Sequence, residues 1–471
     1  MDNQFHIPVS LKQLITANQA FHHRIVPVEK RENKVIFRTD AENLPELEQE
    51  LKILFGYNLK LEKETSTTLQ SYLSLNYRQT TTAETEELNY KNNFLQQLLQ
   101  TAKDYGSSDI HLEPYEDRCR VRFRLDGKLK EQFSISLAEY PQIINQIKIQ
   151  AGLDISQKRL SQDGRITVKS AQEDFDIRVS TLPTLHGEKI VLRILKRDAE
   201  EVSLSNLGFS DRELSLYMEG IKKPNGIVLI SGPTGSGKTT TLYGTLKLLN
   251  QETTNILTIE DPIEYTLAGV NQVQLKEDIG FDFPAALRTF LRQDPDIIMV
   301  GEIRDEKTAT MAIKAALTGH LVLSTIHTNS AWSTISRLID MGIPSYLISS
   351  TLNLSVAQRL VRKLCDNCKQ AADIKEATLP EGFKVPIEMA QHFLPVGCPT
   401  CFHTGYHGRK AIYEVVPITK SLEPAIRQNE AEIDSYFLEK KLSTLRTNAI
   451  RMIISGETSI EEVYSLLNNE N

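Results

Sequence analysis

The sequence Gly232-Pro233-Thr234-Gly235-Ser236-Gly237-Lys238-Thr239 decides the fold of this chain. The apolar run 226–230 precedes it, and leucines at helical spacing follow it at positions 242, 246 and 249. A strand, a glycine-rich loop and a helix in this order can bind phosphate, because backbone N–H groups and the helix N-terminus converge on the anion. We therefore predict a nucleotide site that extends to Thr240, in which Lys238 contacts the β- and γ-phosphates and the Thr239 hydroxyl holds Mg²⁺. The alternative, a chance glycine-rich turn, does not explain why a strand and a helix flank the loop in register.

The composition is that of an ordinary globular protein with several cores. A chain of 471 residues is too long for one core, so we expect about three or four folded units. Its net charge of -7 argues against a protein that coats nucleic acid and is compatible with a local basic groove. No apolar stretch approaches the ~18 residues of a spanning helix, and the first residues do not resemble a signal peptide. We expect a cytoplasmic protein with no membrane span, whose membrane role runs through partners.

Residues 1–85 combine short strands with an amphipathic helix. Val35-Ile36-Phe37 is typical of a strand, and leucines recur at helical spacing at positions 44, 47, 51 and 54. The stretch 79–87 is polar and without periodicity, so we interpret it as a linker.

The segment 86–200 contains a clear alternation of arginine and apolar residues at positions 118–125. A period of two predicts a strand with Cys119 in the core and four arginines on the other face, followed by a hairpin turn at Asp126-Gly127. We interpret the arginine face as a solvated or subunit-facing surface. A polyanion-binding face is the alternative, but no aromatic residues interleave with the arginines to stack bases.

Between residues 201 and 360 strand-like and helical patterns alternate, which predicts an α/β domain. Three apolar runs, at 256–259, 297–300 and 321–326, each end in polar residues. Because ligands bind at the carboxyl ends of parallel strands, three such ends beside a phosphate loop predict a catalytic site.

Hydrolysis of ATP needs a carboxylate that orients or deprotonates the attacking water, and a metal across the β- and γ-phosphates. Glu302 follows an apolar strand and is our first choice for the water. Gly301 stands where an aspartate is usual, so Glu260, Asp261 and Glu264 are candidates for the metal, with helix capping as the alternative role. His320 and His327 bracket the third run, and we interpret them as sensors of the γ-phosphate or of a subunit interface rather than core residues. These candidates are Glu260, Asp261, Glu264, Glu302, His320 and His327.

Four of the five cysteines form two C-x-x-C pairs. Two such pairs supply the four thiolates of a structural zinc site, at Cys365, Cys368, Cys398 and Cys401. A redox dithiol would need only one pair, and a catalytic zinc would keep an open position.

Four segments stand in an order that resembles the ATPases of type II secretion and type IV pilus assembly. They correspond to the family's Walker A, Asp box, Walker B and His box, at residues 232–239, 260–264, 294–305 and 318–328. Residues 108–114, 162–165, 178–180 and 405–409 resemble further motifs of the same family. The resemblance covers the chain from about residue 90 to 471, and residues 20–80 resemble only the later part of the family's first N-terminal domain.

The resemblance implies a RecA-like P-loop ATPase domain preceded by small α+β domains and followed by a zinc subdomain and C-terminal helices. The expected boundaries are 1–85 for a short first N-terminal domain with linker, 86–200 for a PAS-like second N-terminal domain, 201–360 for the ATPase domain, 361–415 for the zinc subdomain and 416–471 for the helices. The tetracysteine motif favours the assembly branch over the retraction motors.

The resemblance also implies how the enzyme works. It implies a homohexamer at the inner membrane, where ATP-driven domain rotation assembles pilins or pseudopilins through a platform protein, with a recruiting protein as a second partner. Cofactors are ATP, Mg²⁺ and Zn²⁺. By matching positions, arginines reach the phosphates: Arg178 and Arg193 from the second N-terminal domain, and Arg337 and Arg409 elsewhere. A hexameric motor acting on nucleic acid and a nucleotide-gated scaffold without turnover are the rival hypotheses; the acidic balance disfavours the first, and the presence of Lys238 and Glu302 disfavours the second.

Overall fold

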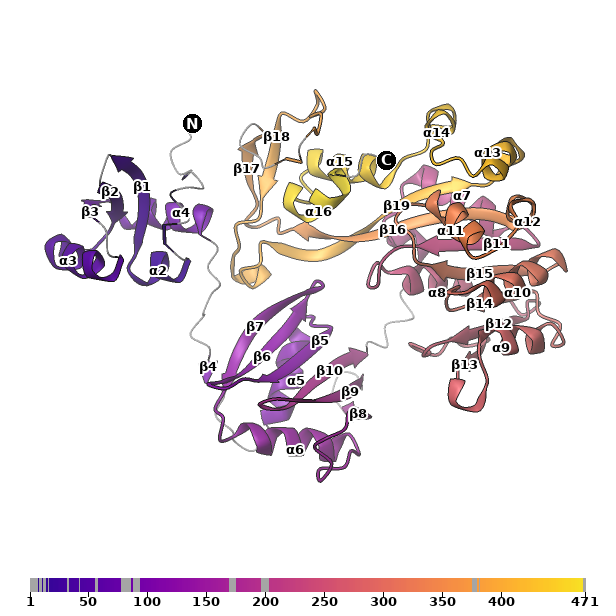
Figure 1. Cartoon of the computed structure of the whole chain (residues 1–471), viewed down its shortest axis with the longest axis horizontal. Coiled ribbons are helices and arrows are strands. Elements are labelled where there is room, and N and C mark those ends of the chain that lie inside the picture. The colour runs from indigo at the N-terminus through magenta and orange to yellow at the C-terminus, as the bar shows by residue number, and fades with distance from the viewer. Residues whose placement is uncertain are drawn as a thin grey trace.

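The computed structural model describes most of the chain. The described residues are 7, 11, 14–15, 17–31, 34–41, 43–55, 58–77, 86–87, 94–168, 175–195, 203–374, 379–380 and 382–468. They form three main sheets and one small one (Figure 1). Within these residues no helix has both the length and the hydropathy needed to cross a bilayer.

The N-terminal unit is a three-stranded sheet covered by helices. Strands β1 (Ile25–Arg31) and β2 (Lys34–Thr39) are antiparallel, β3 (Leu59–Lys63) runs parallel to β2, and the helices are α2 (Ala17–His22), α3 (Leu44–Phe55) and α4 (Ser66–Asn76). The strand predicted at 35–37 and the helix predicted from residue 44 are both confirmed. Residues 79–85 of the predicted linker lie outside the described residues. Glu86–Glu87 form strand β4 beside β7, so the predicted linker extended too far.

The second unit is built on a seven-stranded sheet of order β4-β7-β6-β5-β10-β9-β8. Its other strands are β5 (Asp109–Pro114), β6 (Cys119–Leu125), β7 (Lys128–Ile135), β8 (Gln162–Val168), β9 (Phe175–Thr184) and β10 (Gly187–Leu195). Helices α5 (Phe94–Asp104) and α6 (Tyr140–Gln150) supply the apolar side chains that meet Val121 and Phe123 in one core. Cys119 is buried there as predicted, and burial raises its pKa to about 11.

The arginine face of β6, expected to be solvated or subunit-facing, is partly covered by ion pairs within its own unit. Glu113 on neighbouring β5 is buried and accepts hydrogen bonds from Arg120 Nε at 2.9 Å and Arg122 Nε at 2.8 Å. Arg124 Nε lies 3.2 Å from Asp109 Oδ2 on the same strand. Carboxylates of β5 therefore neutralise much of this face, because cross-strand neighbours bring opposite charges together.

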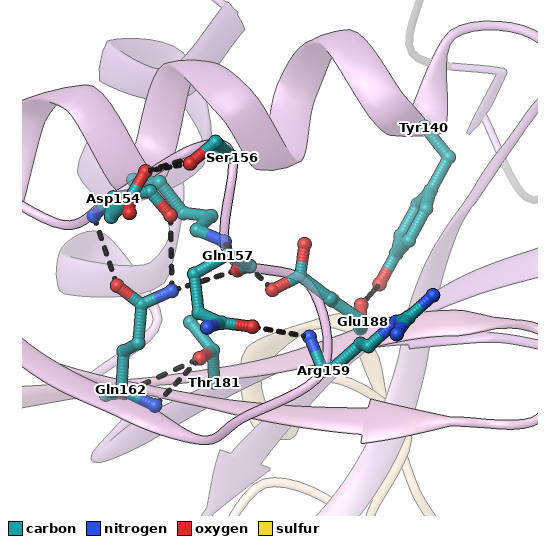
Figure 2. Close-up of polar contacts among 9 residues, drawn as sticks. Tyr140, Asp154, Ser156, Gln157, Arg159, Gln162, Thr181 and Glu188 are labelled. Carbon is teal, nitrogen blue, oxygen red and sulfur yellow. Dashed lines mark hydrogen bonds and ion pairs between the residues drawn. The ribbon is translucent and has the colours of Figure 1, made fainter.

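Figure 2 shows how the loop between α6 and β8 is held. Lys148, fully buried at the end of α6, donates to Glu188 Oε1 at 2.8 Å and to the backbone oxygen of Gln157 at 2.7 Å. The side chain of Gln162 bonds backbone atoms of Asp154 and Gln157. Two positions on, a Cβ at Gly164 would stand 2.5 Å from the oxygen of Ala151, so only glycine fits there. The motif at 162–165 thus has a structural role in this unit.

The third sheet has the order β13-β12-β14-β15-β11-β16-β19 and confirms the predicted α/β class. Strands β11 (Gly226–Ser231), β12 (Ile256–Glu260), β13 (Asn271–Gln274), β14 (Ile297–Val300), β15 (Leu321–Ile326) and β16 (Leu352–Leu364) are parallel, and β19 (Tyr406–Pro417) is antiparallel to β16. Apolar cores cover both faces. The helices around it are α7 (Asp211–Ile221), α8 (Lys238–Leu249), α9 (Phe283–Phe290), α10 (Glu306–Leu317), α11 (Ser333–Asp340) and α12 (Ser345–Thr351).

Strands β16 and β19 extend beyond this sheet and carry the cysteine segment (Figure 1). Both strands cross the boundaries expected at residues 360 and 415, because their long antiparallel pairing continues past the parallel part of the sheet. A two-stranded sheet of β17 (Gln370–Asp373) and β18 (Gln391–Leu394) lies within the segment. Helices α13 (Glu423–Gln428), α14 (Asp434–Lys440), α15 (Leu445–Ile454) and α16 (Ile460–Leu467) complete the chain.

Candidate active site and cysteine cluster

The phosphate loop follows β11 and ends where α8 begins. Gly237 is the N-cap of α8 with φ 87°, a left-handed conformation that glycine adopts without strain, and no side chain caps this helix. The Lys238 amine donates to the backbone oxygens of Gly232 at 2.8 Å and Pro233 at 3.1 Å. The buried Ser236 hydroxyl has no partner among the described residues. A loop with uncapped helical N–H groups and an unpaired hydroxyl fits a bound phosphate chain.

The loop borders a cavity of about 940 Å³. Its walls come from four places in the chain. The phosphate loop supplies Thr234 to Thr240, and the carboxyl ends of the parallel strands supply Glu260, Asp261, Glu264, Glu302 and His327. The second unit supplies Asp109, Arg124 and Arg193, and Arg409 comes from the start of β19.

Glu302 is a carboxylate of the cavity that interacts with two other predicted site residues, His327 and Lys238. It follows β14, its side chain is 16% exposed, and it accepts a hydrogen bond from the Arg304 guanidinium. His327 Nε2 lies 3.5 Å from Glu302 Oε2. Burial lowers the pKa of Lys238, and the charge of Glu302 opposes that effect. Glu302 therefore sits between a lysine that can bind phosphate and a histidine that can hold a water or a phosphate oxygen.

The three carboxylates of the 260–264 segment differ in how free their oxygens are to bind a metal ion. Glu260 is 3% exposed and accepts bonds from Thr258 Oγ1 at 2.7 Å, from Gln272 Nε2 at 3.1 Å and from the Tyr243 hydroxyl. These donors occupy its oxygens within the protein, so Glu260 is poorly placed to bind a metal directly. Asp261 and Glu264 are exposed and line the cavity.

Arginines from the second unit reach the cavity as an ion-paired set. Arg193 Nε lies 2.9 Å from Asp109 Oδ1, and Arg124 pairs with the other oxygen of the same carboxylate. Burial raises the pKa of Asp109, but hydrogen bonds from Arg193 and Ser108 outweigh it and leave that pKa lowered. Asp109 thus stays charged and holds two guanidinium groups side by side.

Arg178 takes a different position from Arg193. Its Nη2 donates to the backbone oxygen of Ile263 at 2.7 Å, and its Nη1 lies 3.5 Å from Glu264 Oε2. It therefore joins the second unit to the 260–264 segment rather than lining the cavity.

The four paired cysteines lie in one cluster. Their sulfur atoms all lie within 4.8 Å of one another, with Sγ–Sγ distances of 3.8 Å for Cys365–Cys398, Cys368–Cys401 and Cys398–Cys401. A tetrahedron with zinc–sulfur bonds of about 2.3 Å has sulfur–sulfur edges of about 3.8 Å. Backbone N–H groups of Gly397 and Gly405 point at Cys368 Sγ and Cys401 Sγ, each at 3.3 Å, as thiolate acceptors require. The cluster fits a four-coordinate metal site.

Comparison with known proteins identifies the family. The sequence model of the family described as "Type II/IV secretion system protein" matches residues 84–465. This chain belongs to that family. The type IV pilus assembly ATPase PilB of Myxococcus xanthus is 40% identical, over 98% of this chain and 87% of that protein. The putative type II secretion system protein E of Escherichia coli is 44% identical, over 78% of this chain and 74% of that protein.

A solved structure agrees with the fold. The pilus retraction motor PilT with bound ADP has a TM-score of 0.53 and 26% identity, covering 80% of this chain and 96% of that one. The predicted family resemblance and the prediction of an ATPase are therefore confirmed. Nothing in the comparisons supports the alternative of a motor acting on nucleic acid.

Like Arg178, the predicted site residues His320 and Arg337 of this secretion ATPase do not line the cavity. His320 is at the opposite end of β15 from His327, and its Nδ1 contacts the Ala315 oxygen at 2.8 Å. At about 3.3 Å per residue the strand separates the two histidines by roughly 20 Å. Arg337, on α11, lines a different cavity of about 410 Å³ together with Arg446 and Glu414. Within one chain neither residue therefore lies beside the phosphate loop, because sequence order within a motif does not give the edge of the sheet. The alternative of a subunit-interface role for His320 stays a prediction.

Three charged residues of the cavity, Asp109, Arg124 and Arg304, were not predicted as site residues. Asp109 and Arg124 could be assigned to the site only once it was known that β5 pairs with β6 and β10, and the sequence does not show that pairing. Arg304 stands two positions after Glu302. On an extended segment this spacing puts both side chains on one face, so the sequence could have indicated their contact.

Proposed function

We propose that this secretion ATPase is a cytoplasmic homohexameric motor that hydrolyses ATP to drive pilin or pseudopilin assembly through an inner-membrane platform protein. One observation carries the proposal: the phosphate loop, the strand-end carboxylates and an arginine pair from a separate sheet border the same cavity. Relatives named for pilus assembly and for type II secretion support the choice of process.

Each residue group in the cavity has a proposed role. Lys238 and the loop N–H groups bind the phosphates, and Thr239 with Asp261 or Glu264 holds Mg²⁺, which neutralises the charge of the leaving phosphate. Glu302 orients the attacking water and accepts its proton, and His327 holds Glu302 or the γ-phosphate in place. Arg193 and Arg124 contact the γ-phosphate when the two units close, so that nucleotide occupancy sets the domain geometry.

We propose the same domain division as the sequence suggested, with β16 and β19 shared between the ATPase and zinc segments. Residues 1–85 bind a recruiting protein at the membrane, residues 86–200 move against the ATPase domain, and the C-terminal helices pack on it. The four cysteines hold one structural Zn²⁺, whose Lewis acidity takes no part in hydrolysis because all four positions are protein ligands.

The test combines hydrolysis and assembly. Glu302→Gln in the full chain should keep ATP binding and lose roughly 10²- to 10⁴-fold in kcat. Glu252→Gln, the same change at an exposed turn, is the matched control and should keep the parental rate. In the cell that encodes the protein, the Glu302→Gln allele should abolish surface pili or type II secretion at an unchanged protein level.

Two outcomes would contradict the proposal. Normal pili and normal secretion with a catalytically inactive chain would refute the motor function. A rate of hydrolysis that rises severalfold on addition of DNA or RNA would favour a motor on nucleic acid instead.

A further inference from the structure

The segment that follows the last cysteine links the cysteine cluster to the second unit. We name residues 402–408 the knuckle loop. It connects Cys401 of the cluster to Arg409, which lines the nucleotide cavity. Figure 1 shows β5, β6 and β7 below the far end of the β16–β19 pair, where this loop lies. No role in the proposed hydrolysis requires the loop to touch the second unit, so its contacts need a separate explanation.

The loop is attached to the second unit at both of its ends. At one end, the Phe402 ring stacks on Tyr105, the residue that follows α5, with a centroid distance of 4.1 Å and an interplanar angle of 23°. Phe402 also packs against the core of that unit. The Lys130 amine of β7 donates to the Phe402 backbone oxygen. At the other end, the Gly408 N–H donates to Asp126 Oδ2 at 2.9 Å, and Asp126 Oδ1 lies 3.7 Å from Arg409 Nε.

The loop is equally well attached to the cysteine cluster. The Gly405 N–H donates to Cys401 Sγ at 3.3 Å, the His403 N–H to the Cys398 oxygen at 2.8 Å, and Thr404 Oγ1 to the Cys401 oxygen at 2.7 Å. A thiolate held by a metal is a fixed acceptor, whereas a free thiol rotates and accepts weakly. The position of the loop therefore depends on the state of Cys401.

The loop backbone also shows that its conformation is imposed. Phe402 and His403 have φ values of 49° and 57°, a left-handed region that is unfavourable for bulky residues. Such a pair persists only where neighbouring contacts determine it. The contacts available are those to the cluster on one side and to Tyr105 and Lys130 on the other.

We propose that the knuckle loop is a metal-dependent latch that holds the second unit closed over the nucleotide cavity. The metal fixes Cys401, Cys401 fixes the loop, and the loop presents Phe402 to Tyr105 and Arg409 to the cavity. Asp126, Lys130 and Tyr105 are positioning residues: they act on the nucleotide through the knuckle loop. The consequence for ATP rests on the proposed function, whereas the latch itself is a property of the fold.

The experiment measures the distance between the units in the full chain. Fluorophores are attached through encoded, non-cysteine amino acids at Tyr115 in the second unit and Ile387 in the cysteine segment, both exposed. Labelled chains are diluted with unlabelled ones, so that energy transfer occurs within one chain. With zinc bound we expect one narrow distance distribution; after chelation we expect a broader and longer one.

A variant that keeps the metal separates the latch from mere unfolding of the cysteine segment. Phe402→Ala retains all four cysteines, so it should still bind one zinc per chain, yet it should shift the closed-to-open equilibrium roughly tenfold toward the open form. His407→Ala, an exposed position in the same loop, is the matched control and should leave the distance unchanged. A zinc-loaded Phe402→Ala protein with the parental distance distribution would overturn the proposal.

The Asp126 contact is tested through nucleotide affinity. Asp126→Asn keeps the acceptor for Gly408, and asparagine tolerates the φ of 45° at this turn, but the charge beside Arg409 is lost. We expect weaker binding of a fluorescent ATP analogue by a few fold, with no change for Asp117→Asn at an exposed site of the same unit. Equal affinities in the two variants would refute the positioning role. If the distance shifts as expected but a catalytically inactive chain still gives normal pili and normal secretion, the latch stands and the proposed function falls.

Discussion

Replacing Lys148 by methionine should destabilise the second unit more than any surface change of the same kind. The Lys148 side chain is fully buried and that of Glu188 is 7% exposed, and their charged atoms lie 2.8 Å apart. Methionine nearly preserves the volume but leaves the Glu188 carboxylate buried without a cation, and it removes one of the two donors to the Gln157 oxygen. Breaking a buried pair from one side costs about 3–5 kcal/mol, a large share of the stability of one domain.

The assay should resolve this unit from the rest of the chain, because unfolding of a protein with several domains is not two-state. Native-state hydrogen exchange of the α6 amides gives the free energy of opening locally. Lys158→Met, ten residues along and exposed, is the matched control and should stay within about 0.5 kcal/mol of the parent.

The double variant Lys148→Met/Glu188→Gln tests the cause of the loss. Removing both charges should recover part of the stability, since the uncompensated carboxylate is the main cost. A loss below about 1 kcal/mol for Lys148→Met, or a double variant less stable than the single one, would refute this reasoning.

Four further outcomes are expected. Lys238→Ala should lose nucleotide binding as well as turnover, whereas Glu302→Gln should lose turnover alone; equilibrium binding of labelled ATP distinguishes them. Purified protein should contain one zinc per chain, and Cys398→Ser should lose it and lower the melting temperature of the region after residue 361; well under one equivalent with unchanged folding would contradict the site. Arg193→Ala should reduce kcat more than it reduces ADP affinity. Specific activity of the parent protein should rise with protein concentration as rings assemble, and an activity independent of concentration would contradict the ring. Burial raises the pKa of Glu113, but hydrogen bonds from three basic side chains lower it to about 2, so its stabilisation is present above about pH 4.5 and is lost toward pH 2; acid unfolding of a Glu113→Gln variant should lack that slope.

Local sequence patterns predicted the parts of this fold that depend on local physics. The alternation at 118–125 gave β6 to within one residue, and the apolar runs gave β12, β14 and β15. The phosphate loop was predictable because its glycines, Lys238 and the following leucines are contiguous in the chain.

Features that depend on which strands are neighbours were not predictable. The arginines of β6 appeared solvated because Glu113 and Asp109, their partners, lie on a strand whose pairing the sequence does not show. His320 was placed beside the phosphates although it lies at the other edge of the sheet. The availability of Glu260 was overestimated because its hydrogen bonds come from Tyr243 and Gln272, which belong to other elements.

The β16–β19 pair has a mechanical consequence. Near its middle, the Gln358 side chain accepts a bond from Thr241 Oγ1 of α8 at 3.0 Å, and at its far end, just past Leu364, lies Cys365. Two paired strands resist bending, so this ribbon acts as a stiff lever arm with its fulcrum beside the phosphate loop. Seven residues of strand span about 23 Å, so that a tilt of about ten degrees at the fulcrum would displace the tip by about 4 Å. A small change of angle beside the phosphate loop would thus reach the cysteine cluster as a displacement of several ångströms.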